Sequence, residues 1–275
     1  MRYFGFLLFF SGQLSFAQRV TQALFNEKEF AICGHRGGFY SEFPENSLAV
    51  LNYVTSQARH RPLFLEIDIR QSINGTLYIL HDESVDRTTN GVGNIKELSD
   101  EYIHQLFLKS KAGVLSGERV IELSYLLDRL RDSSVFLMLD IKSNAWKETA
   151  ELILKNGWAS RCLFLTFKPE DTERVMRVSD QLYVSALIRS EADWLKIRSY
   201  SIPMQHVIAY VERTVTTELI HFLKQQGSKI MADVSEHTTN DGKLYTKAYY
   251  QHRLKDQKLD ILITDFPIEV AAMIK

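Results

Sequence analysis

Leu-Phe-Leu-Glu-Ile-Asp-Ile, at residues 63–69, is the stretch that decides the fold. Most of its side chains are apolar, on both faces of the expected strand. This pattern indicates a strand covered on both faces, as in a parallel sheet. Runs of similar character recur at residues 30–34, 135–141, 162–166, 182–187, 206–211, 229–234 and 260–264. Segments with helical spacing separate most of these runs, at residues 46–58, 122–130, 146–155, 171–178 and 216–226. The repetition of strand and helix predicts right-handed βαβ crossovers and an α/β domain.

One further strand-like run, Leu77–Leu80, breaks the alternation, because only residues 70–76 separate it from the second strand. A parallel crossover needs a dozen or more residues, so this run is predicted to turn back as an antiparallel hairpin at Asn74-Gly75. The remaining strands match the repeat and the size of a (β/α)8 TIM-type barrel. A doubly wound open sheet is the alternative fold.

The N-terminal residues resemble a targeting segment. Arg2 precedes an apolar run from Tyr3 to Phe10, and Ser15-Phe16-Ala17 has the small-x-small pattern of a signal-peptidase site. We expect residues 1–17 to be a signal peptide, residues 18–275 to form one barrel domain, and the mature protein to be periplasmic or extracellular. A cytosolic protein with an apolar N-terminal helix is the alternative. No stretch reaches the roughly 18 consecutive apolar residues of a membrane span.

The composition is that of a globular chain, with 45% hydrophobic and 24% charged residues among 275. Because 33 basic residues face 34 acidic ones, no general basic excess is available to bind nucleic acid. Any phosphate chemistry therefore depends on a local site. Cys33 and Cys162 lie in or beside apolar runs, and we interpret both as buried thiols, with a single disulfide as the alternative.

Carboxylates interrupt two of the apolar runs. Glu66 and Asp68 are two residues apart on one strand, so both face the same side, and Asp140 and Lys142 repeat this spacing one barrel strand later. Three acids at one barrel mouth raise each other's pKa values unless a cation lies among them. All-oxygen ligation suits Mg²⁺, Ca²⁺ or Mn²⁺. The alternative is a buried ion-pair network in which Lys142 and Arg36 neutralise the acids.

Two histidines follow strands and adjoin charged residues: His35 precedes Arg36, and His81 precedes Asp82. Imidazoles titrate near neutral pH, so this pair can serve as general base and general acid, and we predict that both act in catalysis. The other histidines have no comparable context and are interpreted as surface or packing residues: His60, His104, His206, His221, His237 and His252.

A series of short motifs resembles the signature of the glycerophosphodiester phosphodiesterase family. In chain order the motifs are GHRG at 34–37, PENS at 44–47, EID at 66–68, NG at 74–75, HD at 81–82, RTTNGVG at 87–93, DIK at 140–142 and DILITDFP at 260–267. The resemblance is dense over residues 33–98 and weaker between residues 160 and 258. It extends over nearly all of the chain that follows the predicted signal peptide.

The resemblance implies a barrel enzyme that uses a divalent metal ion, Ca²⁺ or Mg²⁺. It implies hydrolysis of a small-molecule glycerophosphodiester to sn-glycerol 3-phosphate and an alcohol. The roles that it implies are His35 and His81 as the acid and base, Glu66 and Asp68 as metal ligands, Arg36 and Lys142 as phosphate-binding cations, and Asn46 as a residue near the metal.

Three further residues complete the predicted site. Asp140 stands where most family members have glutamate, and we expect it to be the third metal ligand. Glu45 and Asp82 are expected to orient the residues that touch metal and substrate. The segment from Met231 to Val234 also departs from the family, in which many members carry a tryptophan at this strand end.

The same residues are compatible with two other functions. A phospholipase-D-like or phosphoinositide-specific phospholipase would act on lipid phosphodiesters, and an apolar, aromatic rim beside the metal would favour it. A non-catalytic module would bind phosphorylated ligands with a vestigial site. Its sign would be the loss of an acid, a histidine or a cation, and none of the predicted set is missing. The oligomeric state is left open.

Overall fold

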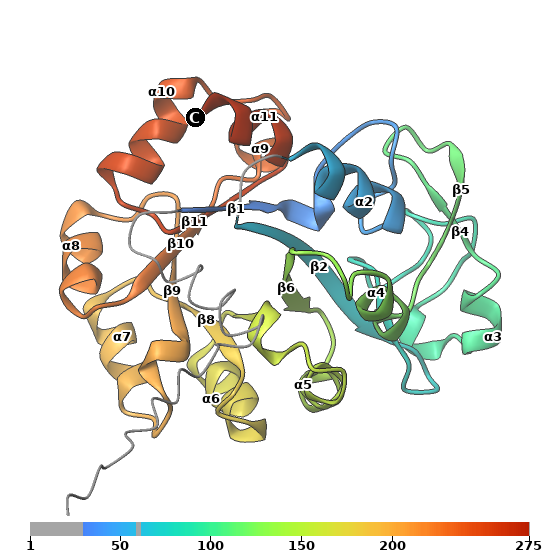
Figure 1. Cartoon of the computed structure of the whole chain (residues 1–275). Helices are drawn as coiled ribbons and strands as arrows, with labels where there is room; N and C mark the ends of the chain where they lie inside the picture. Colours follow the sequence, from blue (N-terminus) through green and yellow to red (C-terminus); the bar gives the residue numbers. More distant parts are fainter. Residues whose placement is uncertain (1–29, 59–61, 275) are drawn as a thin grey trace, which may run out of the picture.

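The computed structural model describes residues 30–58 and 62–274 (Figure 1). The predicted signal peptide, residues 1–17, and His60 lie outside the described residues. The parallel strands are β1 Ala31–Gly34, β2 Leu63–Gln71, β6 Phe136–Ile141, β7 Cys162–Thr166, β8 Tyr183–Leu187, β9 Val207–Val211, β10 Lys229–Asp233 and β11 Ile261–Thr264. Because β1 pairs with both β2 and β11, the sheet closes on itself. The predicted barrel is confirmed, and the open sheet is excluded.

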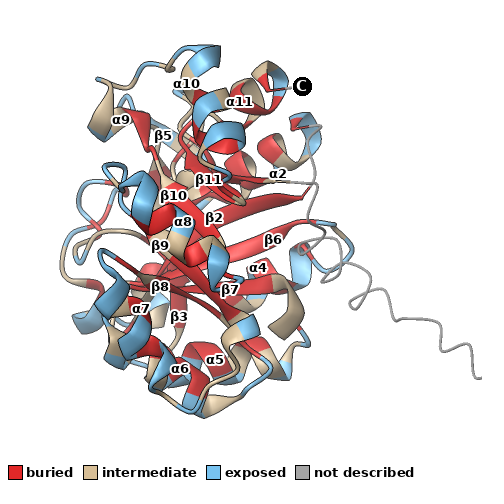
Figure 2. Cartoon of the chain, turned by 90° about the vertical axis from the view of Figure 1, so that its left-hand side faces the viewer, coloured by how far each residue is buried: buried red, intermediate tan, exposed pale blue. Residues whose placement is uncertain are grey.

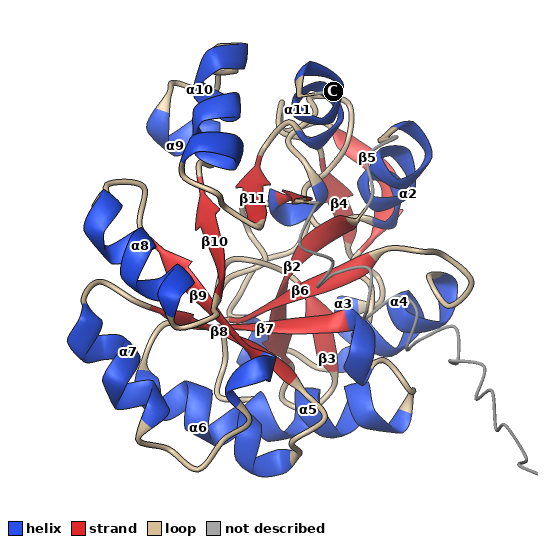
Figure 3. Ribbon diagram, turned by 60° about the vertical axis from the view of Figure 1, so that its left-hand side comes forward, coloured by secondary structure: helices blue, strands red, loops and turns tan. Residues whose placement is uncertain are grey.

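Helices surround the strands on the outside of the barrel (Figure 3). The longer ones are α2 Leu48–Gln57, α4 Leu123–Arg129, α5 Trp146–Lys155, α6 Pro169–Val178, α7 Glu191–Arg198, α8 Thr217–Gln225 and α11 Pro267–Met273. Shorter helices are α3 Asp100–Ile103, α9 Glu236–Thr239 and α10 Lys247–Gln251. The five helices predicted from spacing are all present. The spacing does not predict α7, which buries only Trp194 and Ile197 and so carries a weak periodic pattern.

The chain between β2 and α4 forms an insertion, residues 77–122, beside the barrel. β3, Leu77–Ile79, pairs antiparallel with the end of β2, so the predicted hairpin is confirmed. A second hairpin pairs β4, Phe107–Lys109, with β5, Leu115–Arg119. The sequence pattern does not predict it, because β5 has no buried residue. The insertion packs on a small apolar core of its own, which includes Tyr78 and Ile103.

Side chains of the barrel strands alternate between two cores. On β2, Phe64 belongs to the apolar cluster inside the barrel, whereas Leu65 and Ile67 belong to the larger cluster that includes residues of the surrounding helices. Figure 2 shows the strands as the buried centre of the molecule. This alternation decides which residues of a strand can reach the barrel interior.

Both cysteines are buried and unpaired, which confirms their interpretation as core thiols. Within residues 30–58 and 62–274, no helix is both long and apolar enough to cross a membrane.

Candidate active site

Three carboxylates enter the mouth of the barrel from two neighbouring strands. Glu66 and Asp68 share the interior face of β2, and the strand register pairs Asp68 with Asp140 on β6. Ligand oxygens of the three acids all lie within 4.8 Å of one another. The three side chains are buried. The structure therefore brings together the acids that the i, i+2 spacing predicts to share one space.

The pKa values of these acids are raised. Burial, together with the negative charge of Asp68, raises the pKa of Glu66 to about 8. Burial also raises the pKa of Asp140, although Lys142 opposes the rise. The cluster thus holds more negative charge than the surrounding protein balances.

Two protein cations balance part of this charge. Lys142 Nζ lies 2.5 Å from Asp140 Oδ2 and 3.3 Å from Asp68 Oδ1, and Arg36 Nε lies 3.7 Å from Asp68 Oδ2. Among the described residues, no lysine, arginine or histidine forms an ion pair with Glu66 within 4.0 Å. The ion-pair alternative therefore accounts for Asp68 and Asp140, whereas among the described residues Glu66 has no ion-pair partner within 4.0 Å and only the more distant charge of His35 opposes its own. The all-oxygen donor set fits a hard divalent ion such as Mg²⁺ or Ca²⁺.

The loop after β1 has two non-glycine residues with positive φ, Arg36 at 50° and Asn46 at 58°. Such conformations are uncommon for residues other than glycine, and they cluster at functional sites. The backbone N–H of Arg36 donates to Glu66 Oε2 at 2.6 Å. Asn46 Nδ2 donates to Asp68 Oδ2 at 2.8 Å, and Asn46 Oδ1 accepts the backbone N–H of Asp68 at 3.2 Å. The loop thereby fixes the orientation of two of the acids, which places Asn46 where the sequence predicts it.

The Arg36 side chain has one hydrogen-bonding group left over. Its Nη1 donates to Glu45 Oε1 at 3.1 Å, but its buried Nε has no hydrogen-bond partner. An unsatisfied buried donor is costly, so such a group favours an incoming acceptor. A phosphate oxygen above the carboxylate cluster would supply that acceptor.

A chain of ion pairs on the rim of the barrel connects His81 to Arg36. His81 Nδ1 donates to Asp82 Oδ1 at 2.7 Å, and Arg87 Nε donates to Asp82 Oδ2 at 2.5 Å. Arg87 also donates to both oxygens of Glu45, at 2.9 Å and 2.7 Å. Arg87 and His81 hold the pKa of Asp82 well below its usual range. Glu45 thus contacts Arg36, Asp82 contacts His81, and Arg87 links the two acids.

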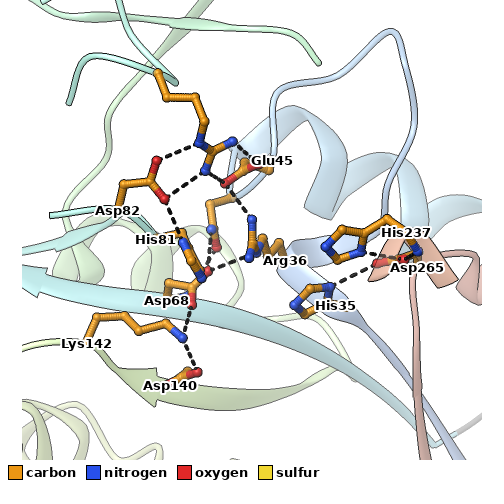
Figure 4. Close-up of polar contacts among 12 residues, drawn as sticks. His35, Arg36, Glu45, Asp68, His81, Asp82, Asp140, Lys142, His237 and Asp265 are labelled. Atoms are coloured by element: carbon orange, nitrogen blue, oxygen red, sulfur yellow. Dashed lines mark hydrogen bonds and ion pairs between the residues drawn. The ribbon is translucent and has the colours of Figure 1, made fainter. Parts of the chain in front are cut away.

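His35 belongs to a second hydrogen-bonded group, formed with Asp265 and His237 (Figure 4). Its Nδ1 donates to Asp265 Oδ1 at 2.9 Å, and His237 Nδ1 donates to Asp265 Oδ2 at 2.8 Å. The two imidazole rings stack with centroids 5.2 Å apart. Burial alone lowers the pKa of His35, but the Asp265 hydrogen bond and the charge of Glu66 outweigh it and raise the pKa to about 9. Because a carboxylate holds Nδ1 of both His35 and His81, Nε2 is the nitrogen of each ring that is left for another partner.

The sequence interpretation of His237 as a surface or packing residue is wrong. His237 follows β10, and Asp265 follows β11 at the carboxyl end of the strand next to β1. The available signal was their position after barrel strands, where such folds place working residues. The pairing of His35 with Asp265 needs the register of the closed barrel, in which Gly34 lies opposite Thr264.

Most of the other described histidines have surface partners. His104 pairs with Glu122, His252 with Asp256 and His221 with Gln225, while His206 stacks on Tyr183. None of these four lies within the groups that His35 and His81 form, as predicted.

Comparisons with known proteins give a consistent result. The model of the glycerophosphoryl diester phosphodiesterase family matches residues 35–269. Glycerophosphodiester phosphodiesterase 1 of Mus musculus is 27% identical over 190 residues, which cover 66% of this chain and 55% of the mouse protein. The chain thus matches about half the length of that curated relative.

Solved structures match over more of the chain. A glycerophosphoryl diester phosphodiesterase from Parabacteroides distasonis superposes with a TM-score of 0.83 and 25% identity, covering 95% of this chain and 92% of that protein. A phosphodiesterase from Oleispira antarctica, in complex with the product sn-glycerol-3-phosphate, has a TM-score of 0.68 and 18% identity, covering 89% of this chain and 96% of that protein. The second likeness concerns the fold.

Proposed function

This chain belongs to the glycerophosphodiester phosphodiesterase family, and we propose that it hydrolyses glycerophosphodiesters to sn-glycerol 3-phosphate and an alcohol. The proposed cofactor is Ca²⁺ or Mg²⁺, held by Glu66, Asp68 and Asp140. The observation that carries the proposal is the convergence at one barrel mouth of three acids and two carboxylate-anchored histidines. The product bound by the structurally similar Oleispira antarctica phosphodiesterase supports the choice of substrate.

The protein's own cations bind and orient the phosphodiester. Arg36 offers its Nε, which has no hydrogen-bond partner, and Lys142, held by Asp140 and Asp68, offers its ammonium group from the end of β6. A divalent ion bound by the acids would add charge neutralisation for the non-bridging oxygens, on which negative charge accumulates. Both cations are thereby placed to favour the transition state over the bound substrate.

The two histidines transfer the protons. One imidazole accepts the proton of the nucleophile while the other donates a proton to the departing alkoxide. If water is the nucleophile, sn-glycerol 3-phosphate forms directly. If a neighbouring substrate hydroxyl is the nucleophile, a cyclic phosphodiester forms first, and water then opens it with the two imidazoles in exchanged roles. Asp265 and Asp82 hold Nδ1 of His35 and His81, so each Nε2 keeps the orientation needed for transfer. In each displacement step one imidazole gains a proton and the other loses one, so the total charge of the histidine pair does not change.

A single assay tests the activity and the cofactor. Purified protein is incubated with glycerophosphocholine and glycerophosphoethanolamine after chelator dialysis, and released glycerol 3-phosphate is measured with and without added Ca²⁺ or Mg²⁺. We expect no turnover without metal and restored turnover with one of the two ions. Glu66→Gln is the matched variant, because it keeps the side-chain size and removes the charge. Full activity of the metal-free protein would exclude the proposed cofactor.

Lysophospholipids in the same assay separate the lipid alternative. If the protein releases a phosphorylated lipid or the headgroup faster than it releases glycerol 3-phosphate from soluble diesters, the substrate is a lipid. Binding of glycerophosphocholine without turnover under all metal conditions would favour the non-catalytic module.

Export to the periplasm or the extracellular space is a further part of the proposal. Its support is the basic residue, apolar run and small-x-small pattern within residues 1–17. Expression of the full chain in a Gram-negative host, followed by fractionation and N-terminal sequencing, tests it. A mature N-terminus at Gln18 in the periplasm or medium would support export, and an uncleaved cytosolic protein would contradict it.

A further inference from the structure

A cavity of about 150 Å³ lies beside the candidate site, between the loop after β1 and the insertion. The residues of its wall that matter here are Phe39, Glu45, Arg87, Thr88, Lys109 and Lys111. Glu45 forms ion pairs with Arg36 and Arg87, and Arg87 with the Asp82 that holds His81. The cavity is therefore connected to Arg36 through Glu45, and to His81 through Arg87 and Asp82.

The cavity carries an excess of positive charge. Its one carboxylate, Glu45, is already bound by Arg36 and Arg87. Lys109 Nζ donates to the backbone carbonyl of Asp86 at 3.1 Å, and Lys111 Nζ lies 3.9 Å from the centroid of the Phe39 ring. In the described part of the chain, neither lysine forms an ion pair with a carboxylate within 4.0 Å. Both lysines line the cavity, and the acid whose pKa Lys109 helps to lower, Asp86, does not line it.

A buried hydroxyl gives a second, independent observation. Thr88 lines the cavity, is 5% exposed, and its Oγ1 has no hydrogen-bond partner. Its backbone carbonyl accepts the N–H of Lys109 at 2.7 Å, which ties the hydroxyl to the lysine-bearing strand β4. A buried polar atom without a partner is costly, so this hydroxyl also indicates a polar ligand.

Of the three aromatic residues that line the cavity, Phe39, Tyr40 and Phe43, Phe39 is not free to bind a cationic ligand. Phe39 stacks on His237 with centroids 4.8 Å apart, and Lys111 covers it at 3.9 Å. Two groups this close cannot share one face, so both faces of the ring are occupied. Quaternary ammonium ligands such as choline need open aromatic faces.

We propose that this cavity is the subsite for the alcohol part of the substrate, and that it selects an alcohol bearing an anionic group, a phosphate or a carboxylate. The inference rests on the proposed function, because the alcohol is one half of the glycerophosphodiester. Lys109 and Lys111 pair with the anionic group, and the Thr88 hydroxyl donates a hydrogen bond to it. Phe39 positions Lys111 by its ring face.

Matched substrates test the selection. Glycerophosphoinositol 4-phosphate and glycerophosphoinositol differ only by the second phosphate, and glycerophosphates of 3-hydroxypropionate and propanol differ only by the carboxylate. Glycerophosphocholine supplies the cationic alcohol. Each exposed ion pair contributes a factor of up to about fivefold, so two lysines are expected to give about a tenfold higher kcat/KM for the anionic member of a pair. The pair with the larger ratio identifies phosphate or carboxylate as the preferred group.

Variants assign the preference to the lysines. Lys109→Met and Lys111→Met should each reduce the ratio within a matched pair about threefold, and the double variant should reduce it to about one. Lys96→Met is the control, since Lys96 is an exposed residue of the same insertion and does not line the cavity. Raising the salt concentration should reduce the wild-type ratio, because screening weakens exposed ion pairs.

The outcomes separate the inference from the proposed function. A preference for the anionic member that disappears in the double variant supports the subsite. Turnover that does not depend on the charge of the alcohol, that favours glycerophosphocholine, or that keeps its preference in the double variant overturns the subsite alone. If no glycerophosphodiester is hydrolysed under any metal condition, the proposed function fails and the subsite with it.

Discussion

The two histidines proposed as acid and base are anchored by the same chemistry in different parts of the fold. His35 follows a barrel strand, and its fully buried partner Asp265 lies at the carboxyl end of the neighbouring strand β11. His81 lies on the rim, where Asp82 is 29% exposed and the bridging Arg87 is 50% exposed. We call His35, Asp265 and the three acids the barrel half of the site, and His81, Asp82 and Arg87 the rim half. Strand register fixes the barrel half, whereas solvent-exposed ion pairs hold the rim half. Two histidines with the same proposed role are thus held in place by different structural means, a buried carboxylate in one case and exposed ion pairs in the other.

The largest expected effects concern the histidines themselves and should be similar in the two halves. His35→Ala and His81→Ala should each lower kcat by roughly 10²-fold or more, the usual size of a lost general acid or base. Steady-state kinetics between about pH 5 and pH 9 measures the loss, and circular dichroism checks that each variant folds. If one variant is folded and keeps near wild-type kcat throughout, its histidine is not catalytic.

Metal binding should depend on pH because the Glu66 carboxyl, in the barrel half, must lose its proton to bind an ion. Since the pKa of Glu66 is raised to about 8, the metal-free protein holds a proton on this carboxyl below that pH, and a bound ion must displace it. Apparent metal affinity should therefore rise about tenfold per pH unit up to about pH 8 and then level off.

Calorimetric titration of wild-type protein with Ca²⁺ and Mg²⁺, in two buffers that differ in ionisation enthalpy, measures both the affinity and the proton released. Glu66→Gln is the control, because it removes the titrating group and should abolish the proton release. Affinity that stays constant from about pH 6 to pH 8 would contradict the assignment of Glu66 as a ligand.

The orienting acids should show the contrast between the halves directly. Asp265→Asn keeps the size of a buried side chain but removes the charge that holds two histidines, so we expect kcat to fall by about tenfold or more. Asp82→Asn should cost less, because its partner His81 lies in a solvated rim and Arg87 stays bound to Glu45. Comparison of kcat for the two variants decides the matter. Equal losses would mean that burial does not govern the support of the histidines.

The barrel half is also the part that sequence reasoning predicted best. The period of a strand places Glu66 and Asp68 on one face, and the repeated spacing at Asp140 places the third acid beside them. This prediction needs only the separation of two positions between Glu66 and Asp68 on one strand. Local patterns of this kind survive folding because the backbone itself enforces them.

Contacts between distant segments escaped the same reasoning. His35 meets Asp265 across 230 residues, and Arg87 meets Glu45 across 42 residues. The first contact depends on the closure of the barrel and the second on the path of the insertion, and neither is encoded in a local period. The role of His237 was missed for this reason, since its partner lies in the following strand-end loop.

Asp140 allows a smaller test within the barrel half. It lies among the acids, yet it also forms a 2.5 Å ion pair with Lys142, so it could be a ligand or only the partner of the lysine. Asp140→Asn keeps its size and removes its charge, and a ligand should then lose metal affinity by at least about tenfold. Calorimetry with Ca²⁺ and Mg²⁺ measures this loss. Unchanged affinity for both ions would remove Asp140 from the metal site and leave it as the residue that positions Lys142.

The smallest expected effect belongs to Arg87, the exposed link of the rim half. Arg87→Gln breaks its ion pairs with Asp82 and Glu45, but neither partner loses all support, since Asp82 keeps His81 and Glu45 keeps Arg36. Exposed ion pairs contribute about 1 kcal/mol or less, so kcat should fall only about fivefold.

The salt dependence of kcat tests whether the Arg87 ion pairs support His81. Screening of exposed charges is nearly complete over a few ångströms at high ionic strength, so raising salt from about 0.05 M to about 1 M should lower wild-type kcat toward that of Arg87→Gln and change the variant little. Asp265→Asn, whose defect is buried, should keep the wild-type salt dependence. If wild type and Arg87→Gln respond to salt alike, the rim ion pairs do not support His81, and its orientation must come from Asp82 and the backbone of the insertion alone.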